Sequence, residues 1–373
     1  MIKTISLTKG LVAIPSYVGP SCDESKVGTF IYNYLGQFPW LTVKKQFVTK
    51  TRFNIVAIDK SPTELLFCGH IDTVEPKGKW VAPKIQSGKL YGLGSSDMKG
   101  TIATMLAAVS EAGPTKGVAW LFYVDEEYDF LGMKRFIADY RNRLAPKLVV
   151  GEGSDNQIRN GCRGLIEIKF TVTGITGHAS RPELGKNAII GAQKIFAGIQ
   201  DQVAKCVDRR VGSSSINLAS INGGLDLGDS QIGRQGNNIA NYCEFIIDIR
   251  TANKTLRAND LVRLATQIAR QNKLGLTSAV RHDKLGWFSA TLALPKLILA
   301  KYPVCTDFRS GYVDTQMLNE AFGCPCFGFG CGLGDQAHKK GEFIPVKNLT
   351  TGQQFYLDLI TRWKGGENDD TQL

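Results

Sequence analysis

Two histidines and five acidic residues stand in short motifs that are rich in glycine or in acid. In chain order they are His70, Asp72, Asp97, Glu126, Glu127, Glu152 and His338. Neutral imidazoles and carboxylates are ligands that zinc and similar divalent ions take in proteins. The series therefore indicates the site of a two-metal hydrolase.

The first pair follows a predicted buried strand. His70 and Asp72 come directly after the apolar run Leu65-Leu66-Phe67-Cys68. Because they are two positions apart, an extended chain presents both on one face. The imidazole can then ligate a metal while the carboxylate holds the ring, a common arrangement around metal ligands.

Three carboxylates crowd the end of a second predicted strand, 118–124. Asp125, Glu126 and Glu127 repel one another unless a cation lies among them. Neighbouring residues of an extended chain point in opposite directions, so one glutamate can bind metal while the other faces a substrate. An acidic turn on the surface is the alternative that this motif alone leaves open.

The remaining members are weak signals singly. Glu152 lies between two glycines after the strand 147–150, Asp97 lies in the loop 92–100, and His338 ends the glycine-rich segment 332–338. A set of two histidines and several carboxylates from separate strand ends is much more specific than any one of them, because it is what a pair of zinc ions requires.

The elements that must position these residues alternate between strand and helix. We predict strands at 54–58, 64–68, 118–124 and 148–150, with helices at 99–112 and 132–143. Such alternation predicts an α/β sheet flanked by helices, in which ligands collect at the carboxyl ends of strands. After residue 284 the same texture resumes, with helices at 292–300, 313–322 and 349–363 and a strand at 326–330.

The middle of the chain has a different pattern. It predicts, in order, strand 165–173, helix 186–203, strands 216–221 and 242–250, helix 256–271 and strand 277–282. This is the split βαβ pattern of a small two-layer domain. We therefore expect a discontinuous catalytic domain, residues 1–163 and 284–373, and an inserted domain, residues 164–283.

Length and composition agree with two domains, because 373 residues with 43% hydrophobic composition exceed one compact unit. No apolar stretch approaches the roughly 20 residues of a membrane span, so we expect a cytoplasmic protein without membrane contact. We interpret the nine cysteines as reduced, buried thiols. A structural zinc at Cys324, Cys326 and Cys331 is disfavoured because paired C-x2-C motifs are missing.

The net charge of +11 and the pI near 9.1 raise the question of a polyanionic partner. Lysines and arginines are scattered, and no aromatic-interleaved basic stripe occurs, so we expect no nucleic-acid binding. Attraction of anionic small substrates or of an acidic protein partner is the milder interpretation.

Six motifs together carry a family resemblance: CGHIDTV, GLGSSDMKG, DEE, GEG, GHAS and GDQAHKKGE. They resemble the co-catalytic dizinc aminoacylase and peptidase family, and most of all its acetylornithine deacetylase and succinyl-diaminopimelate desuccinylase branch. The resemblance covers almost the whole chain. It implies a zinc-peptidase-like catalytic domain, with a central mixed sheet flanked by helices, and an inserted α+β, ferredoxin-like lid and dimerisation domain.

The resemblance also implies roles for the acid and imidazole series. Two divalent metals are implied, zinc or else cobalt: His70 and Glu152 would bind one, Asp97 would bridge both, and Glu127 and His338 would bind the second. Asp72 would orient His70, and Glu126 would be the general base that passes a proton to the leaving amine. A cis peptide bond is implied at Asp97-Met98.

Further residues are implied outside the metal site. His178 alone could merely cap a turn, whereas the resemblance implies that it reaches the partner subunit's active site in a homodimer and stabilises the oxyanion. Substrate recognition would fall to Arg163, Asn238 and Arg250, since arginine pairs well with carboxylates. Gly332 and Gly334 would leave backbone N–H groups free for a substrate carboxylate.

The implied reaction is removal of an acyl group from the α-amino nitrogen of a small N-acyl amino acid in arginine or lysine biosynthesis. Two alternatives stay open: a dipeptidase or carboxypeptidase, and release of an amino acid from an acidic carrier protein. A catalytically dead metal-binding protein would lack a ligand or the base, and none is missing. Lys339 and Lys340 depart from the usual sequence after the last histidine, so the resemblance does not predict the residues at the substrate end of the pocket.

Overall fold

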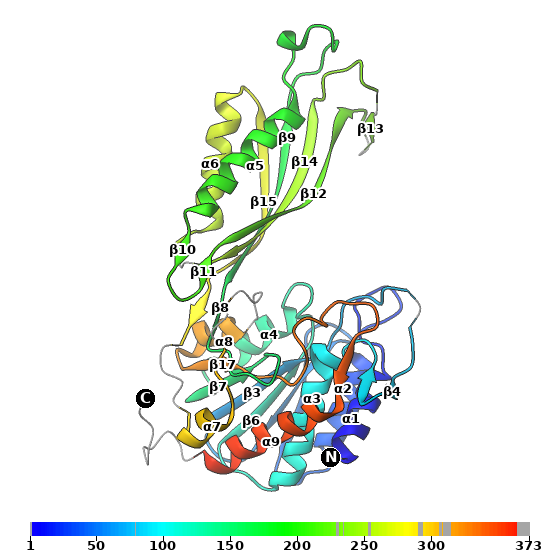
Figure 1. The fold of residues 1–373 in the computed structure, drawn as a ribbon, viewed down its shortest axis with the longest axis vertical. Helices are drawn as coiled ribbons and strands as arrows, with labels where there is room; N and C mark the ends of the chain where they lie inside the picture. The colour runs from blue at the N-terminus through cyan, green and yellow to red at the C-terminus, as the bar shows by residue number, and fades with distance from the viewer. Residues whose placement is uncertain are drawn as a thin grey trace. The chain divides into compact units, whose positions relative to one another are not determined.

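The computed structural model describes residues 2–78, 80–228, 231–233, 235–252, 255–289, 294–305, 308 and 315–363. The chain divides into two compact units (Figure 1). The first unit comprises residues 1–160, 289–306 and 313–373, and the second comprises residues 161–288 and 307–312.

A six-stranded mixed sheet forms the centre of the first unit, in the order β1-β2-β6-β3-β7-β17. The strands are β1 (Thr42–Phe47), β2 (Phe53–Ile58), β3 (Leu65–His70), β6 (Val118–Tyr123), β7 (Leu148–Gly151) and β17 (Cys326–Gly328). β6, β3, β7 and β17 run parallel. At one edge β2 pairs antiparallel with β6, and β1 pairs antiparallel with β2. Every residue of β3 and β6 is buried, as expected for strands covered on both faces.

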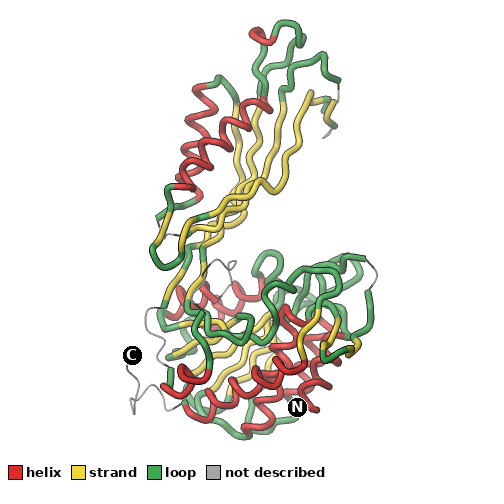
Figure 2. Tube along the Cα trace, in the orientation of Figure 1, coloured by secondary structure: helices red, strands yellow, loops and turns green. Residues whose placement is uncertain are grey.

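Helices cover this sheet (Figure 2). They are α1 (Ile2–Val12), α2 (Ser25–Leu35), α3 (Gly100–Ala112), α4 (Leu131–Tyr140), α7 (Lys296–Lys301), α8 (Thr315–Phe322) and α9 (Val346–Arg362). α1, α3 and α9 pack against one another, and their apolar side chains join those of β2, β3 and β6 in one core. α8 packs against β7 and β17. The mixed sheet flanked by helices confirms the predicted fold class.

A small three-stranded sheet, β18-β5-β4, lies in the same unit. Its strands are β4 (Lys84–Gln86), β5 (Lys89–Tyr91) and β18 (Phe343–Pro345). β18 pairs with β5 and thereby joins two segments about 250 residues apart in sequence. The sequence patterns did not predict this sheet, nor α1, α2 and β1.

The second unit has a five-stranded antiparallel sheet, in the order β13-β12-β14-β9-β15. Its strands are β9 (Gly164–Thr173), β12 (Ser215–Asp226), β13 (Ile232–Gly233), β14 (Tyr242–Thr251) and β15 (Gly275–Lys284). α5 (Ala188–Ala204) and α6 (Ala258–Gln271) cover one face of the sheet (Figure 2). The inward-facing residues of β9 and β14 alternate with outward ones and pack against both helices. The predicted split βαβ order is confirmed.

Short elements complete the described part of the chain: β8 (Gly161–Cys162), β10 (Val207–Asp208), β11 (Gly212–Ser213), β16 (Trp287–Phe288) and helical turns at Ser95–Lys99 and Pro182–Leu184. Of the predicted helices 292–300 and 313–322, residues 292–293 and 313–314 lie outside the described residues. All nine cysteines are free thiols. Among the described residues, no helix combines the length and apolarity needed to cross a membrane.

Candidate metal centre

His70 ends β3 and is fully buried. Its Nε2 lies 3.1 Å from Oδ1 of Asp97, and its Nδ1 lies 3.4 Å from Oδ1 of Asp72. Asp72 is also fully buried, just beyond the carboxyl end of the strand. The two residues of the His-x-Asp motif therefore meet as predicted, with Asp72 beside the ring nitrogen that faces away from Asp97.

Asp97 lies in the loop between β5 and α3, and the Asp97-Met98 peptide bond is cis, as predicted. A buried carboxylate that sequence reasoning missed holds this loop. Glu342 accepts hydrogen bonds from the backbone N–H groups of Gly94, Ser96 and Asp97, at 2.8, 2.7 and 3.0 Å. The only sequence signal was an acidic residue four positions after His338.

Glu126 and Glu127 lie in a turn after β6, which corrects our prediction of an extended chain there. The carboxylate of Asp72 stabilises the turn: Oδ1 accepts the N–H of Glu126 at 3.1 Å, and Oδ2 accepts the N–H of Glu127 at 2.9 Å. Asp125 has a positive φ of 73°. The two glutamates are thus separated by turn geometry rather than by strand alternation.

The sequence patterns also did not predict a cluster of ion pairs, formed by Arg52, that stabilises this turn. The guanidinium of Arg52 donates to both carboxylate oxygens of Glu24, at 2.7 and 2.6 Å, and to Asp125. Asp125 in turn accepts the N–H groups of Asp129 and Leu131. Glu24 and Asp125 are buried, and the single positive charge of Arg52 is shared between these two carboxylates at the base of the acidic turn.

The tertiary structure gathers the series into two overlapping groups. Ligand atoms of His70, Asp97 and Glu127 lie within 4.8 Å of one another, and so do those of His70, Glu126 and Glu152. His338 joins the first group, with its Nε2 2.9 Å from Glu127 and 3.6 Å from Asp97. Residues from five separate segments therefore converge on one centre.

Burial opposes ionisation throughout this centre. Burial lowers the pKa of His70, but Asp72 and Asp97 outweigh it and hold the pKa of this imidazole well above its ordinary value. A hydrogen bond to Glu127 likewise raises the pKa of His338. Burial raises the pKa of Glu127. Clustered, buried carboxylates of this kind favour a positive charge among them.

The donor set fits divalent metal ions. Nitrogen and oxygen ligands of a tetrahedral ion at about 2.0–2.2 Å lie about 3.3–3.6 Å apart. The contact of His338 with Asp97, 3.6 Å, lies in this range, whereas those of His70 with Asp97 and of His338 with Glu127, 3.1 and 2.9 Å, are somewhat shorter. Two imidazoles and at least three carboxylates suit zinc and neighbouring borderline metals.

His178 and Asn238 belong to the second unit, where they form an antiparallel bridge. His178 is exposed, and its Nδ1 lies 2.7 Å from the hydroxyl of Ser180. The amide of Asn238 donates to Asn237 at 2.9 Å. The structure thus brings these two predicted residues together at one end of the second sheet.

Arg163 and Arg250 lie at the opposite end of that sheet, because Arg250 pairs with Leu165 whereas Tyr242 pairs with Thr173. Eight residue steps along β9 correspond to about 26 Å. The guanidinium of Arg250 pairs with both oxygens of Asp248, at 2.9 and 3.1 Å. Within one chain, therefore, Arg250 and His178 do not contact the same small ligand.

The structure corrects the prediction that Gly334 leaves its backbone N–H free for a substrate carboxylate. The N–H of Gly334 is not free for a substrate, because it donates to Oδ1 of Asp155 at 3.1 Å. Gly332 meets a steric need: a Cβ there would lie 2.0 Å from the carbonyl oxygen of Ser96. The segment thus packs tightly against the loop that carries Asp97.

Several curated proteins are similar to this chain over nearly their full length. An acetylornithine deacetylase of Proteus mirabilis is 28% identical, with 95% of each chain covered. A putative succinyl-diaminopimelate desuccinylase of Mycobacterium tuberculosis is 26% identical, with 97% of this chain and 98% of the relative covered. A probable carboxypeptidase of Aspergillus clavatus is 28% identical over 66% of this chain and 62% of its own length.

Solved structures share the fold. A tripeptidase from Staphylococcus aureus superimposes with a TM-score of 0.77 at 18% identity, covering 98% of this chain and 99% of its own. A dinuclear metal-binding peptidase from Bacillus subtilis gives a TM-score of 0.68 at 14% identity, covering 96% and 97%. Residues 66–362 match the profile of Peptidase family M20/M25/M40. This match spans every residue of the metal centre, and the chain belongs to that family.

Proposed function

We propose that this metal-dependent hydrolase removes the acyl group from the α-amino nitrogen of an N-acyl amino acid. The observation that carries the proposal is the convergence of two ligand groups that share His70. The acetylornithine deacetylase and desuccinylase relatives cover 95% and 97% of the chain and support this substrate class. By the same analogy we place the reaction in arginine or lysine biosynthesis.

We assign two metal ions, zinc or cobalt, to the centre. His70 and Glu152 would hold one, Glu127 and His338 the other, and Asp97 would bridge them. The dinuclear peptidase of Bacillus subtilis, which shares the fold, supports this number. When bound, two such ions lower the pKa of water and polarise the scissile carbonyl.

The chain's own groups would position and move the proton. Glu126 would take it from the attacking water and deliver it to the leaving amine, as a general base and then a general acid. Asp72 would hold Glu126 through its backbone N–H, at 3.1 Å, while orienting His70. One carboxylate would thus fix both a ligand and the base.

The second unit would act as a lid and a dimerisation domain. We propose that His178 stabilises the oxyanion of the tetrahedral intermediate in the partner subunit's site. Arg163, Asn238 and Arg250 would recognise the substrate. The 26 Å or so between the two ends of the sheet supports a division of these residues between two chains.

A dipeptidase or carboxypeptidase is the second candidate, favoured by the similarity to a probable carboxypeptidase. Release of an amino acid from an acidic carrier protein is a third, favoured by the net charge of +11. A panel of acetylornithine, acetylcitrulline, succinyl-diaminopimelate and simple dipeptides, assayed with zinc-loaded protein, tests the first two. The salt dependence of the rate with an acidic carrier-protein substrate tests the third. Turnover of dipeptides alone would replace the deacylase proposal.

Substitution of the base tests the catalytic assignment. Glu126→Gln keeps the size of the side chain and removes the proton acceptor, so we expect kcat to fall at least about 100-fold. Metal content, measured by elemental analysis, should stay at the wild-type value, whereas Glu127→Gln should lower it. A Glu126→Gln protein with full activity would exclude Glu126 as the base.

A further inference from the structure

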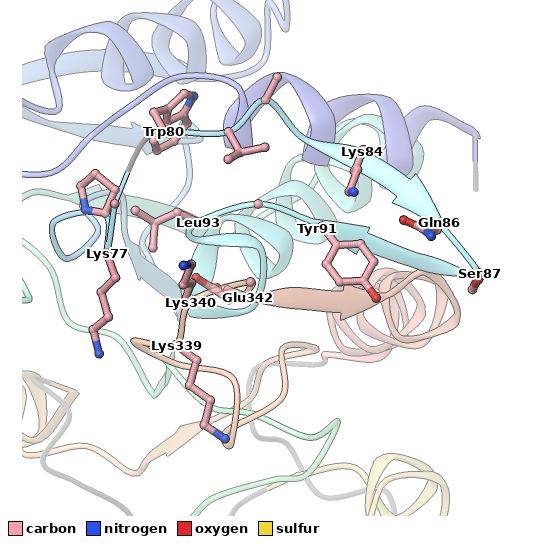
Figure 3. A pocket seen from close by; sticks show the side chains of 16 residues that line it. Lys77, Trp80, Lys84, Gln86, Ser87, Tyr91, Leu93, Lys339, Lys340 and Glu342 are labelled. Carbon is pink, nitrogen blue, oxygen red and sulfur yellow. The ribbon is translucent and has the colours of Figure 1, made fainter.

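A large pocket lies beside the metal centre in the first unit (Figure 3). Its volume is about 620 Å³. Its walls come from residues 76–78 and 80–82, from the β4-β5 hairpin with residues 92–93 that follow it, and from residues 339–342. None of the roles assigned above uses this space.

Two loops of the metal centre form part of its wall. Lys339, which lines the pocket, directly follows His338 in sequence. Glu342 lines it as well, and the same carboxylate accepts the N–H of Asp97 at 3.0 Å. A ligand in the pocket therefore touches the segments that carry two of the proposed metal ligands.

The charge of the lining is positive. Four lysines contribute to it, Lys77, Lys84, Lys339 and Lys340, and all four are exposed. The single lining carboxylate, Glu342, already accepts three backbone N–H groups and is only 2% exposed. The ion pair of Lys339 with Asp335 is long, 3.9 Å, and exposed, so it offsets little of this charge.

Apolar side chains complete the lining. Trp80, Tyr91 and Leu93 are half-buried, and Figure 3 shows them with Lys84 around one space. The volume of about 620 Å³ lies within the range of about 300–1,000 Å³ that is typical of small-molecule sites. Such sites combine apolar and aromatic walls with a few polar or charged groups, and this one has room for a ligand larger than an acetyl group.

We propose that this pocket binds a carboxylate-bearing, partly apolar segment with the dimensions of a short acidic peptide. Lysine ammonium groups would pair with its carboxylates, and Trp80 and Tyr91 would pack against its apolar atoms. We take this segment to be part of the substrate, so the inference rests on the proposed hydrolase function. Lys84 and Lys340 would then be determinants of substrate choice.

Calorimetric titration of the zinc-loaded protein tests the pocket directly. The probe is a peptide of three glutamates, acetylated and amidated at its ends, and the matched peptide has three glutamines. We expect the glutamate peptide to bind at least tenfold more tightly. Lys84→Gln/Lys340→Gln should weaken its binding by about 5- to 20-fold, because each pair is partly exposed.

The matched control is Lys9→Gln/Lys116→Gln, which removes two exposed lysines of the same unit outside the pocket. It should bind the glutamate peptide like the wild type. Equal weakening in both variants would indicate only a general charge effect, and an unchanged affinity in Lys84→Gln/Lys340→Gln would place the peptide elsewhere. Either result overturns the pocket proposal.

The binding result is separable from the proposed function. Loss of peptide affinity in the pocket variant, with no turnover of any acylated amino acid or dipeptide, would support the pocket and refute the hydrolase proposal. Turnover of such substrates with no lysine-dependent peptide binding would support the hydrolase proposal and refute the pocket proposal.

Discussion

At the scale of single residues, Asp72 shows how one buried carboxylate organises a centre. Its two oxygens accept the N–H groups of Glu126 and Glu127, and one of them faces His70. The His-x-Asp spacing predicted the contact with the imidazole. Nothing in the sequence predicted the contact with the acidic turn, which comes from a strand lying next to β3.

Asp358 of α9 is a second buried carboxylate and permits a pH prediction. It accepts hydrogen bonds from Lys301, Tyr302 and Gln354, at 2.5, 3.0 and 2.8 Å. Burial raises the pKa of Asp358, but these three donors outweigh it, so its pKa lies below the ordinary value of 3.8. The folded state therefore favours the ionised form.

We expect Asp358→Asn to lower the free energy of unfolding by about 1–2 kcal/mol at pH 7, because the bonds to a charged acceptor are weakened. Because the folded pKa is depressed, the contribution is complete above pH 3.8 and is lost as the pH falls through the folded pKa. Urea unfolding at pH 7, 5 and 3.5 should show an unchanged difference between the first two and a smaller one at the third. A difference that grows toward acid pH would contradict this account.

At the scale of elements, the approach of β17 to β7 positions Glu152. The two strands are parallel, and Phe329 donates its N–H to the carbonyl of Gly151 at 3.1 Å. A Cβ on Gly328 would lie 1.8 Å from the carbonyl oxygen of Glu152. Glycine is required here because a backbone, which cannot rotate away, occupies the space.

Gly328→Ala should therefore displace the backbone at Glu152. We expect reduced metal content and a fall in melting temperature of several degrees, since overpacking costs about 1–3 kcal/mol. Gly236→Ala serves as the control, because no atom of the described residues, apart from Gly236 and its two chain neighbours, lies within 4 Å of the added Cβ. Elemental analysis and thermal unfolding measure both effects. Wild-type metal content in Gly328→Ala would show that Glu152 tolerates the shift or is not a ligand.

At the scale of the whole molecule, the two units divide the proposed work. The first holds every proposed metal ligand and Glu126, whereas the second holds His178, Asn238, Arg163 and Arg250. If His178 acts across a dimer, an intact site needs Glu126 from one chain and His178 from the other.

Mixed dimers test this arrangement. His178→Ala and Glu126→Gln proteins should each be nearly inactive alone, whereas random mixing should restore roughly a quarter of the wild-type rate, because half of the dimers contain one intact site. Each protein mixed with itself is the control. No recovery, despite exchange of subunits shown by differential tagging, would indicate that His178 acts within its own chain.

The apolar runs of β3, β6 and β7, and the helical pattern of α3, could be predicted from sequence because burial on one or both faces leaves a local signature. α1 and α2 were missed because their buried stripes are short, and β4, β5 and β18 because three residues carry too little pattern. The acid and imidazole residues that we propose as ligands were found from motifs. Arg52, Glu24 and Glu342 were not, because isolated charged residues usually mark an exposed surface.

The sequence by itself determined which side chains could bind metal, because ligand chemistry depends on residue type and on spacing within short motifs. The same motifs pointed to the family to which the chain belongs. Only the tertiary structure decided how these motifs meet. It brought three carboxylates to backbone N–H groups: Asp72 accepts the N–H of Glu127, Glu342 accepts that of Asp97, and Asp155 accepts that of Gly334. The physical reason is that buried polar groups must find partners, and most of these partners lie far away in the chain.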